Sequence, residues 1–166
     1  MTETPLRLLI IDDSPADREL YHILLSQIAM SKYYVLEAET GEAGLALYQA
    51  ARPDCILLDY RLPGLNGLEL LTALASETGQ VPLPVIVLSG AGNELLVADF
   101  MKAGAADYIP KSVLSAHNLE AAITNAVAKH RRRAAWEVQR LKMPPTAARE
   151  FLSMVFDILA GPQERA

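Results

Sequence analysis

The sequence predicts an α/β fold in which a five-stranded parallel sheet is covered by helices on both faces. Short apolar segments alternate five times with segments of helical periodicity, and the connections between them are short. Apolar segments such as Leu6–Ile11 show no alternation toward solvent, as expected of strands that are buried on both sides. At 51% hydrophobic residues, the 166-residue chain can bury a sizeable core. Right-handed crossovers would then join the strands into one doubly wound sheet.

The first half of the chain is expected to contribute three strands and two helices. Ser14 and Pro15 follow the first apolar segment as a capping residue and a proline at the first helical position, so a helix begins there. A second helix begins at Thr40 and continues through Tyr48. The strands expected in this half cover residues 6–11, 33–38 and 54–59.

The second half repeats the alternation after a loop rich in turn residues at 62–67. The next helix contains Leu68 to Leu74. Asn93 can cap a further helix, which Gly104 terminates. The two remaining strands are expected at 84–88 and 107–109, and a last helix begins near Ser115.

Three aspartates follow the first and third predicted strands. In a doubly wound sheet, ligands bind beyond the carboxyl ends of the strands, where the winding direction switches. The flavodoxin-like strand order 2-1-3-4-5 puts the first and third strands side by side at that point, so Asp12, Asp13 and Asp59 should converge. Carboxylates packed together repel one another unless a cation neutralises them. Mg²⁺ is the expected cation, because it takes one or two carboxylates and leaves room for a phosphoryl oxygen.

Two more polar side chains are expected at the same edge of the sheet. Ser89 supplies a hydroxyl and Lys111 an ammonium, one from each of the last two strands. A carboxylate nucleophile, a divalent cation, a hydroxyl and a fixed positive charge suit phosphoryl transfer, which depends mainly on positioning and charge neutralisation. Each residue alone is weak evidence, since an aspartate after a strand is often only a helix cap. Five polar residues at the ends of four apolar strands are much stronger evidence.

At these positions the chain resembles the receiver domain of bacterial two-component response regulators. The resemblance covers roughly residues 5–128 and implies the flavodoxin-like fold. It rests on the segments LLIIDDSPADR, ILLDYRLPGLNGLELL, PVIVLSGAG and KAGAADYIPKS.

The resemblance implies a phosphoacceptor and a metal site. Asp59 would attack the phosphorus of a phosphohistidine on a sensor histidine kinase, or on a phosphotransfer protein, and form an acyl phosphate. Asp12 and Asp13 would hold Mg²⁺, with Asp59 and the backbone carbonyl of Arg61 completing the protein's ligands.

The resemblance also implies a switch. Lys111 would hold a phosphoryl oxygen, Ser89 would move toward the phosphoryl group, and Tyr108 would rotate inward behind it. An aromatic residue in a short strand is usually part of the core, and this alternative for Tyr108 stays open. Ser112 follows the lysine where the family usually has proline, often after a cis peptide bond, so the loop from Lys111 is expected to differ.

The chain continues beyond the expected receiver domain at 1–128 with a helical extension at 129–166. Residues 1–128 carry seven Lys/Arg against sixteen Asp/Glu, whereas residues 129–166 carry eight against four. An apolar stripe extends the last helix to Leu141, and a second amphipathic helix is expected at 148–159 after Pro144 and Pro145. Its apolar face must dock on the same chain or on a second subunit, and we favour a homodimer through residues 116–160. The basic run at 129–133 lacks interleaved aromatic residues, so nucleic-acid binding is disfavoured.

These features together predict a phosphorylatable switch that controls a partner or its own dimerisation. It would show only Mg²⁺-dependent self-phosphorylation and autodephosphorylation, with no metabolic substrate. The alternatives are a receiver portion of a hybrid kinase, a regulator whose basic tail binds nucleic acid, and a haloacid-type phosphatase. The phosphatases typically place a second acid two residues after the nucleophile, where this chain has Arg61. A single cysteine, Cys55, and an opening segment unlike a signal peptide or membrane span predict a cytoplasmic protein.

Overall fold

The computed structural model describes residues 4–29, 32–76, 79–90, 94–142 and 150. The chain forms two compact units, Met1–His130 and Arg131–Ala166. The first unit contains the whole sheet and the predicted site. The predicted boundary after residue 128 stays a prediction.

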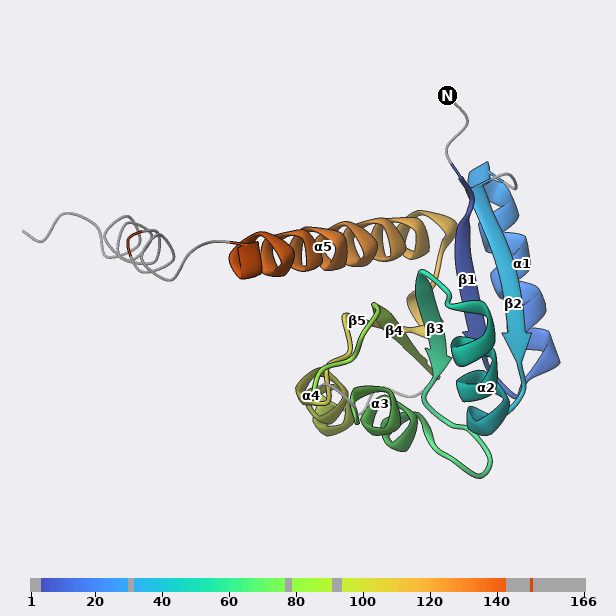
Figure 1. Ribbon diagram of the computed structural model, residues 1–166. Coiled ribbons are helices and arrows are strands. Elements are labelled where there is room, and N and C mark those ends of the chain that lie inside the picture. The colour runs from blue at the N-terminus through green and yellow to red at the C-terminus, as the bar shows by residue number, and fades with distance from the viewer. Residues whose placement is uncertain (1–3, 30–31, 77–78, 91–93, 143–149, 151–166) are drawn as a thin grey trace, which may run out of the picture. The chain divides into compact units, whose positions relative to one another are not determined.

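The first unit is built on a parallel sheet with the order β2-β1-β3-β4-β5, which confirms the predicted topology (Figure 1). Ile11 at the end of one central strand is aligned with Leu58 on its neighbour, so Asp12 and Asp59 follow at the same level of the sheet. The three inner strands are almost wholly buried, as their apolar sequences require. The strands are β1 (Leu6–Ile11), β2 (Tyr33–Ala38), β3 (Cys55–Asp59), β4 (Val85–Ser89) and β5 (Asp107–Pro110).

Helices cover both faces of this sheet, because successive side chains of a strand point to opposite sides. Leu8 and Ile10 of β1 pack in one cluster with side chains of the first and last helices, α1 (Pro15–Ala29) and α5 (Ala116–Lys142). Leu9 and Ile11 face the other side. There they pack in a cluster with side chains from α3 and α4, and the partly buried residues of α2 pack against it. These helices are α2 (Gly41–Ala51), α3 (Gly67–Ala75) and α4 (Glu94–Lys102).

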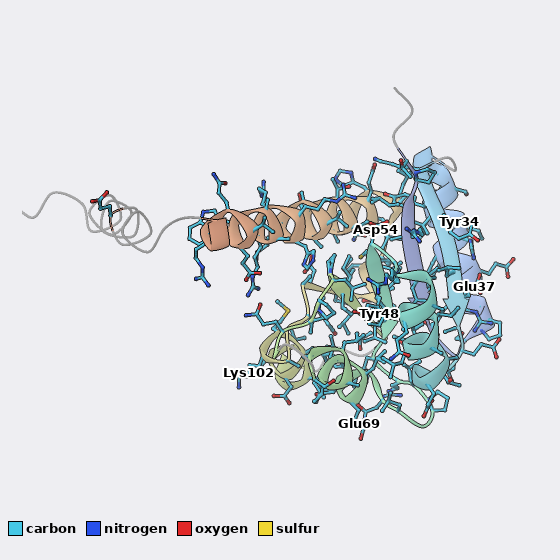
Figure 2. The ribbon with its side chains drawn as sticks, viewed as in Figure 1. Tyr34, Glu37, Tyr48, Asp54, Glu69 and Lys102 are labelled. Atoms are coloured by element: carbon cyan, nitrogen blue, oxygen red, sulfur yellow. The ribbon has the colours of Figure 1, made fainter. Side chains whose placement is uncertain are left out.

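Local signals in the sequence define the helix ends. Ser14 Oγ accepts a hydrogen bond from the Asp17 backbone N–H, which satisfies a free donor in the first turn of α1. Asn66 and Glu69 form a reciprocal capping box at the start of α3. Figure 2 labels Glu69 on this helix. Gly104 ends α4 with a φ of +103°, a conformation that favours glycine. The predicted cap at residue 93 lies outside the described residues.

Helix α5 is a single helix of 27 residues, which confirms the predicted long final helix. Within the first unit, Leu119 and Ile123 are fully buried against the sheet. In the second unit, Trp136 and Val138 are exposed. The amphipathic helix predicted at 148–159 lies outside the described residues. None of the described helices has the length and apolar character that crossing a membrane requires.

Candidate functional site

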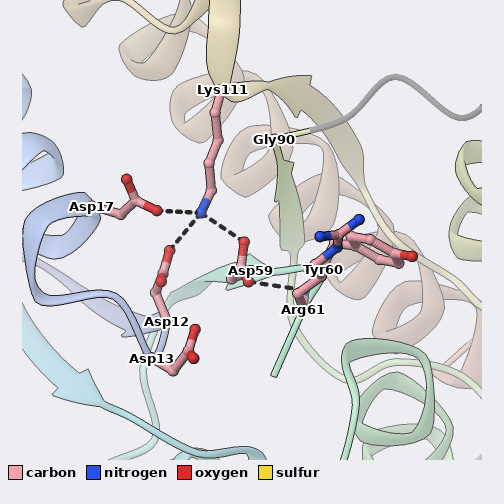
Figure 3. A pocket seen from close by; sticks show the side chains of 8 residues that line it. All are labelled: Asp12, Asp13, Asp17, Asp59, Tyr60, Arg61, Gly90 and Lys111. Atoms are coloured by element: carbon pink, nitrogen blue, oxygen red, sulfur yellow. Dashed lines mark hydrogen bonds and ion pairs between the residues drawn. The ribbon is translucent and has the colours of Figure 1, made fainter. Parts of the chain in front are cut away.

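A cavity of about 440 Å³ opens at the carboxyl edge of the sheet (Figure 3). Its walls come from the ends of β1, β3, β4 and β5 and from the first turn of α1, as the winding switch of the sheet predicts. Eight residues line it: Asp12, Asp13, Asp17, Asp59, Tyr60, Arg61, Gly90 and Lys111.

Three carboxylates converge in this cavity. Asp12, Asp13 and Asp59 each place a potential ligand oxygen within 4.8 Å of the other two. Asp12 and Asp59 are buried, with 1% and 6% of their surface exposed, whereas Asp13 is exposed at the mouth. Two unit charges at that distance repel by about 3–4 kcal/mol at an effective dielectric constant of about 20. Three carboxylate oxygens with one open side are a donor set that suits Mg²⁺, a hard cation that keeps several waters.

Lys111 neutralises part of this negative charge. Its Nζ donates hydrogen bonds to Asp12 Oδ2 at 2.9 Å and to Asp17 Oδ2 at 2.7 Å, and it forms an ion pair with Asp59 Oδ1 at 2.7 Å. The ammonium therefore uses all three of its protons on carboxylates. Burial lowers the pKa of Lys111, but the hydrogen bonds that its ammonium donates to the three carboxylates outweigh this effect and raise the pKa above its ordinary value.

Asp12 is held in place by a set of donors besides Lys111. Its Oδ1 accepts from the Ser14 backbone N–H at 2.9 Å, and its Oδ2 accepts from the Tyr21 hydroxyl at 2.8 Å. Its main-chain carbonyl accepts from Arg18 Nη1 at 2.7 Å. The buried Arg18 side chain also donates to Glu37 and Glu39, so one guanidinium ties α1 to the carboxyl ends of β1 and β2.

Asp59 is oriented from two sides. The Arg61 backbone N–H donates to its Oδ2 at 2.8 Å, while Lys111 lies against its Oδ1. Burial raises the pKa of Asp59, and the ion pair with Lys111 offsets this only in part. The carboxylate is thus fixed in one plane with its negative charge incompletely neutralised, so it can still act as a nucleophile or a metal ligand.

The remaining predicted residues lie around this centre. Ser89 is buried at the end of β4, and the next residue, Gly90, lines the cavity. Tyr108 is half-buried and packs against the core on the α4 side of the sheet. Ser112 is part of a short 3-10 helix at Lys111–Val113, and the described residues contain no cis peptide bond. The expected difference from the family's proline-containing loop stays a prediction, and Lys111 reaches the carboxylates from this position.

Sequence reasoning missed three residues of this site: Asp17, Arg18 and Tyr21. A signal was present for two of them. Tyr21 follows Asp17 by four residues, so these two side chains lie along one face of α1. Nothing in the sequence distinguishes Arg18 from an ordinary surface arginine.

Comparison with known proteins gives a consistent result. The family described as the response regulator receiver domain matches residues 8–124. The phosphate regulon transcriptional regulatory protein PhoB of Pseudomonas aeruginosa is 38% identical over 104 residues, which cover 63% of this chain and 44% of PhoB. Protein PilH of the same organism is 36% identical over 107 residues, which cover 64% of this chain and 86% of PilH. The chain thus spans less than half the length of PhoB.

Solved structures show the same fold. The receiver domain of the NarL response regulator from Mycobacterium tuberculosis is 30% identical with a TM-score of 0.67, covering 75% of this chain and 97% of that one. A receiver domain protein from Clostridium thermocellum is 27% identical with a TM-score of 0.66, covering 76% and 97% of the two chains.

Proposed function

The chain belongs to the response regulator receiver domain family of two-component systems, and we propose that it accepts a phosphoryl group on Asp59. Members of this family are signalling switches rather than metabolic enzymes. The donor would be a phosphohistidine on a sensor histidine kinase or on a phosphotransfer protein. The phosphorylated aspartate would then change the conformation of the domain and so control a partner or its own assembly.

The observation that carries this proposal is the geometry around Asp59. A buried carboxylate lies next to two further acids and is contacted by one ammonium, and all of them open into the same cavity. Asp12, Asp13, Asp59 and the backbone carbonyl of Arg61 would hold Mg²⁺. When bound, Mg²⁺ would supply positive charge against the phosphoryl oxygens and the carboxylates.

The chain's own residues would carry out the transfer as follows. An Asp59 oxygen attacks the phosphorus, a new O–P bond forms, and the P–N bond of the phosphohistidine breaks, leaving the imidazole with the bonding pair and a proton from solvent. The Arg61 N–H keeps the carboxylate plane fixed during this step. Lys111 would turn from Asp59 to an equatorial phosphoryl oxygen and neutralise its charge.

The predicted switch would act through the two remaining residues. Ser89 directly precedes Gly90, which lines the cavity, so a small shift of the β4 end would bring the Ser89 hydroxyl toward a phosphoryl oxygen. Tyr108 is half-buried rather than enclosed, which leaves its ring room to turn inward when Ser89 moves.

Labelling with acetyl phosphate tests the phosphoacceptor directly. Wild-type protein with Mg²⁺ should acquire one phosphoryl group that hydroxylamine removes, as expected of an acyl phosphate, and EDTA should prevent labelling. Asp59→Asn should not be labelled. Asp54→Asn is the matched control, because Asp54 precedes the same strand at its opposite end (Figure 2). Equal labelling of wild type and Asp59→Asn would refute the proposal.

We also propose that residues 116–160 form a homodimer. The support is the long α5 and its exposed Trp136 and Val138, which are costly to leave in water. Light scattering with and without Mg²⁺ and beryllofluoride should show a dimer that Val138→Asp disrupts. Val113→Asp should leave it intact, because Val113 is as exposed (59% against 52%) but lies outside this segment. A monomeric wild type under all conditions would refute the dimer and leave the phosphoacceptor proposal standing.

A further inference from the structure

Asp17 is a fourth carboxylate of the site, and neither the predicted metal set nor the phosphoacceptor includes it. It projects from the first turn of α1, and its Oδ2 lies 2.7 Å from Lys111 Nζ. In Figure 3, Asp17 and Asp59 approach the ammonium from opposite sides. The Asp17 side chain is 35% exposed, so it lies on the solvent side of the Lys111 ammonium.

The three partners of Lys111 differ in what a divalent cation would do to them. Asp12 and Asp59 belong to the carboxylate set that converges within 4.8 Å, whereas Asp17 does not. A cation held by that set would neutralise part of the negative charge of Asp12 and Asp59, and it would also repel the Lys111 ammonium. Of the three acceptors on Lys111, Asp17 alone would keep its full charge for the lysine.

We propose that Asp17 is a positioning residue for phosphoryl transfer: it keeps the Lys111 ammonium in the cavity once Mg²⁺ occupies the Asp12–Asp13–Asp59 set. This inference rests on the proposed function of Asp59. With Asp17 as a fixed anchor, Lys111 exchanges one hydrogen bond, from Asp59 to a phosphoryl oxygen, and does not have to return from solvent. Without that anchor, the repelled side chain spends part of its time outside the cavity.

A simpler role for Asp17 would be to attract Mg²⁺ through its charge alone, and the two roles differ in their Mg²⁺ dependence. A charge that only attracts the metal changes the concentration at which the rate is half-maximal, and excess Mg²⁺ restores the full rate. A residue that positions Lys111 changes the rate that is reached when the metal site is full. The labelling rate with acetyl phosphate, followed as Mg²⁺ is raised to saturation, separates the two.

For Asp17→Asn we expect the saturating rate to fall roughly threefold to tenfold, the effect of a partly exposed, charge-assisted hydrogen bond. Asp17→Glu retains the charge and should recover most of the rate. Glu19→Gln is the matched control, because it removes the same charge from an exposed position on α1, about 200° around the helix from Asp17. It should leave the saturating rate at the wild-type value. Thermal melting of each variant verifies that it is folded.

The outcomes are distinct. A saturating rate for Asp17→Asn equal to that of wild type, with or without a shift in the Mg²⁺ midpoint, overturns the role of Asp17 and leaves Asp59 as the acceptor. An equal loss in Glu19→Gln also overturns it, since the effect would then come from net charge. If wild-type protein is not labelled at all, the proposed function fails and this inference fails with it.

Discussion

The hydroxyl of Tyr21 provides a sharp test of how the metal site is held before any ion binds. Tyr21 is 1% exposed, and its hydroxyl donates to Asp12 Oδ2 at 2.8 Å, from the helix that covers this face of the sheet. Burial raises the pKa of Tyr21, and the neighbouring Asp12 carboxylate raises it further, so the phenol stays protonated and keeps donating at neutral pH. Tyr21→Phe removes this donor and almost no volume.

The expected cost follows from the geometry. A hydrogen bond to a charged acceptor stabilises a protein by about 1.5–3 kcal/mol. Asp12 Oδ2 retains its bond from Lys111 after the substitution, so the lower part of that range applies, about 1.5–2 kcal/mol. For a domain of this size, such a loss lowers the melting temperature by roughly 5–10 °C.

Tyr33→Phe is the matched control. Tyr33 belongs to the same core cluster, and its buried hydroxyl has no hydrogen-bond partner among the described residues. Deleting a buried hydroxyl that lacks a partner relieves a desolvation cost, so Tyr33→Phe should leave the free energy of unfolding unchanged or raise it. Urea denaturation in EDTA, monitored by circular dichroism, measures both variants under the same conditions.

The result that would refute this reasoning is equal stability of the two variants within about 0.5 kcal/mol, the size of an ordinary surface substitution. The Tyr21 hydroxyl would then contribute nothing to the Asp12 position. A large loss in Tyr33→Phe alone would be equally damaging, because it would require a partner for that hydroxyl.

Three further predictions concern stability and reactivity. Burial raises the pKa of Asp59 in the folded state, so ionised Asp59 destabilises the fold. In EDTA at pH 7, Asp59→Asn should therefore unfold at a higher urea concentration than wild type. This difference in stability should vanish as the pH falls to about 4, where Asp59 of the wild type becomes protonated. A persistent advantage at pH 4 would contradict the assignment. Arg18→Lys should lower the free energy of unfolding by about 1–2 kcal/mol in the same assay, because an ammonium cannot replace the guanidinium that reaches Asp12, Glu37 and Glu39. Wild-type stability of this variant would exclude such a role for Arg18. Burial raises the pKa of the Cys55 thiol to about 12, so a thiol reagent at pH 8 should modify it only in denaturant, and rapid reaction of the native protein would disprove its burial.

The strand ends, and with them most of the site, were predictable from local sequence. Leu6–Ile11 and Cys55–Asp59 are short and strongly apolar, which is typical of buried strands, and parallel pairing brings their carboxyl ends to one edge. The positions of Asp12 and Asp59 follow from that topology alone. Lys111 follows in the same way from the end of β5, and a short 3-10 helix begins at this residue.

The contacts between these residues were not predictable, because they depend on how each helix is rotated and docked on the sheet. Asp17 and Tyr21 enter the site because α1 turns that face toward the β1 end, and Arg18 is buried because β2 brings Glu37 and Glu39 beside it. Hydrophobic periodicity gives the buried stripe of a helix but not the rotamer of a polar side chain at its edge.

By itself, therefore, the sequence determined the α/β topology and the carboxylates that meet where the winding of the sheet switches direction. The reason is that short apolar segments alternating with helices predict buried, parallel strands. Tertiary structure alone decided that Lys111 has three carboxylate partners, one of them Asp17 from a different element of the fold. The bonds from Lys111 to Asp12 and Asp17 join residues 99 and 94 positions apart in the chain. Only the folding of the ends of β1 and β5 and the first turn of α1 around one cavity brings these groups to within 3 Å.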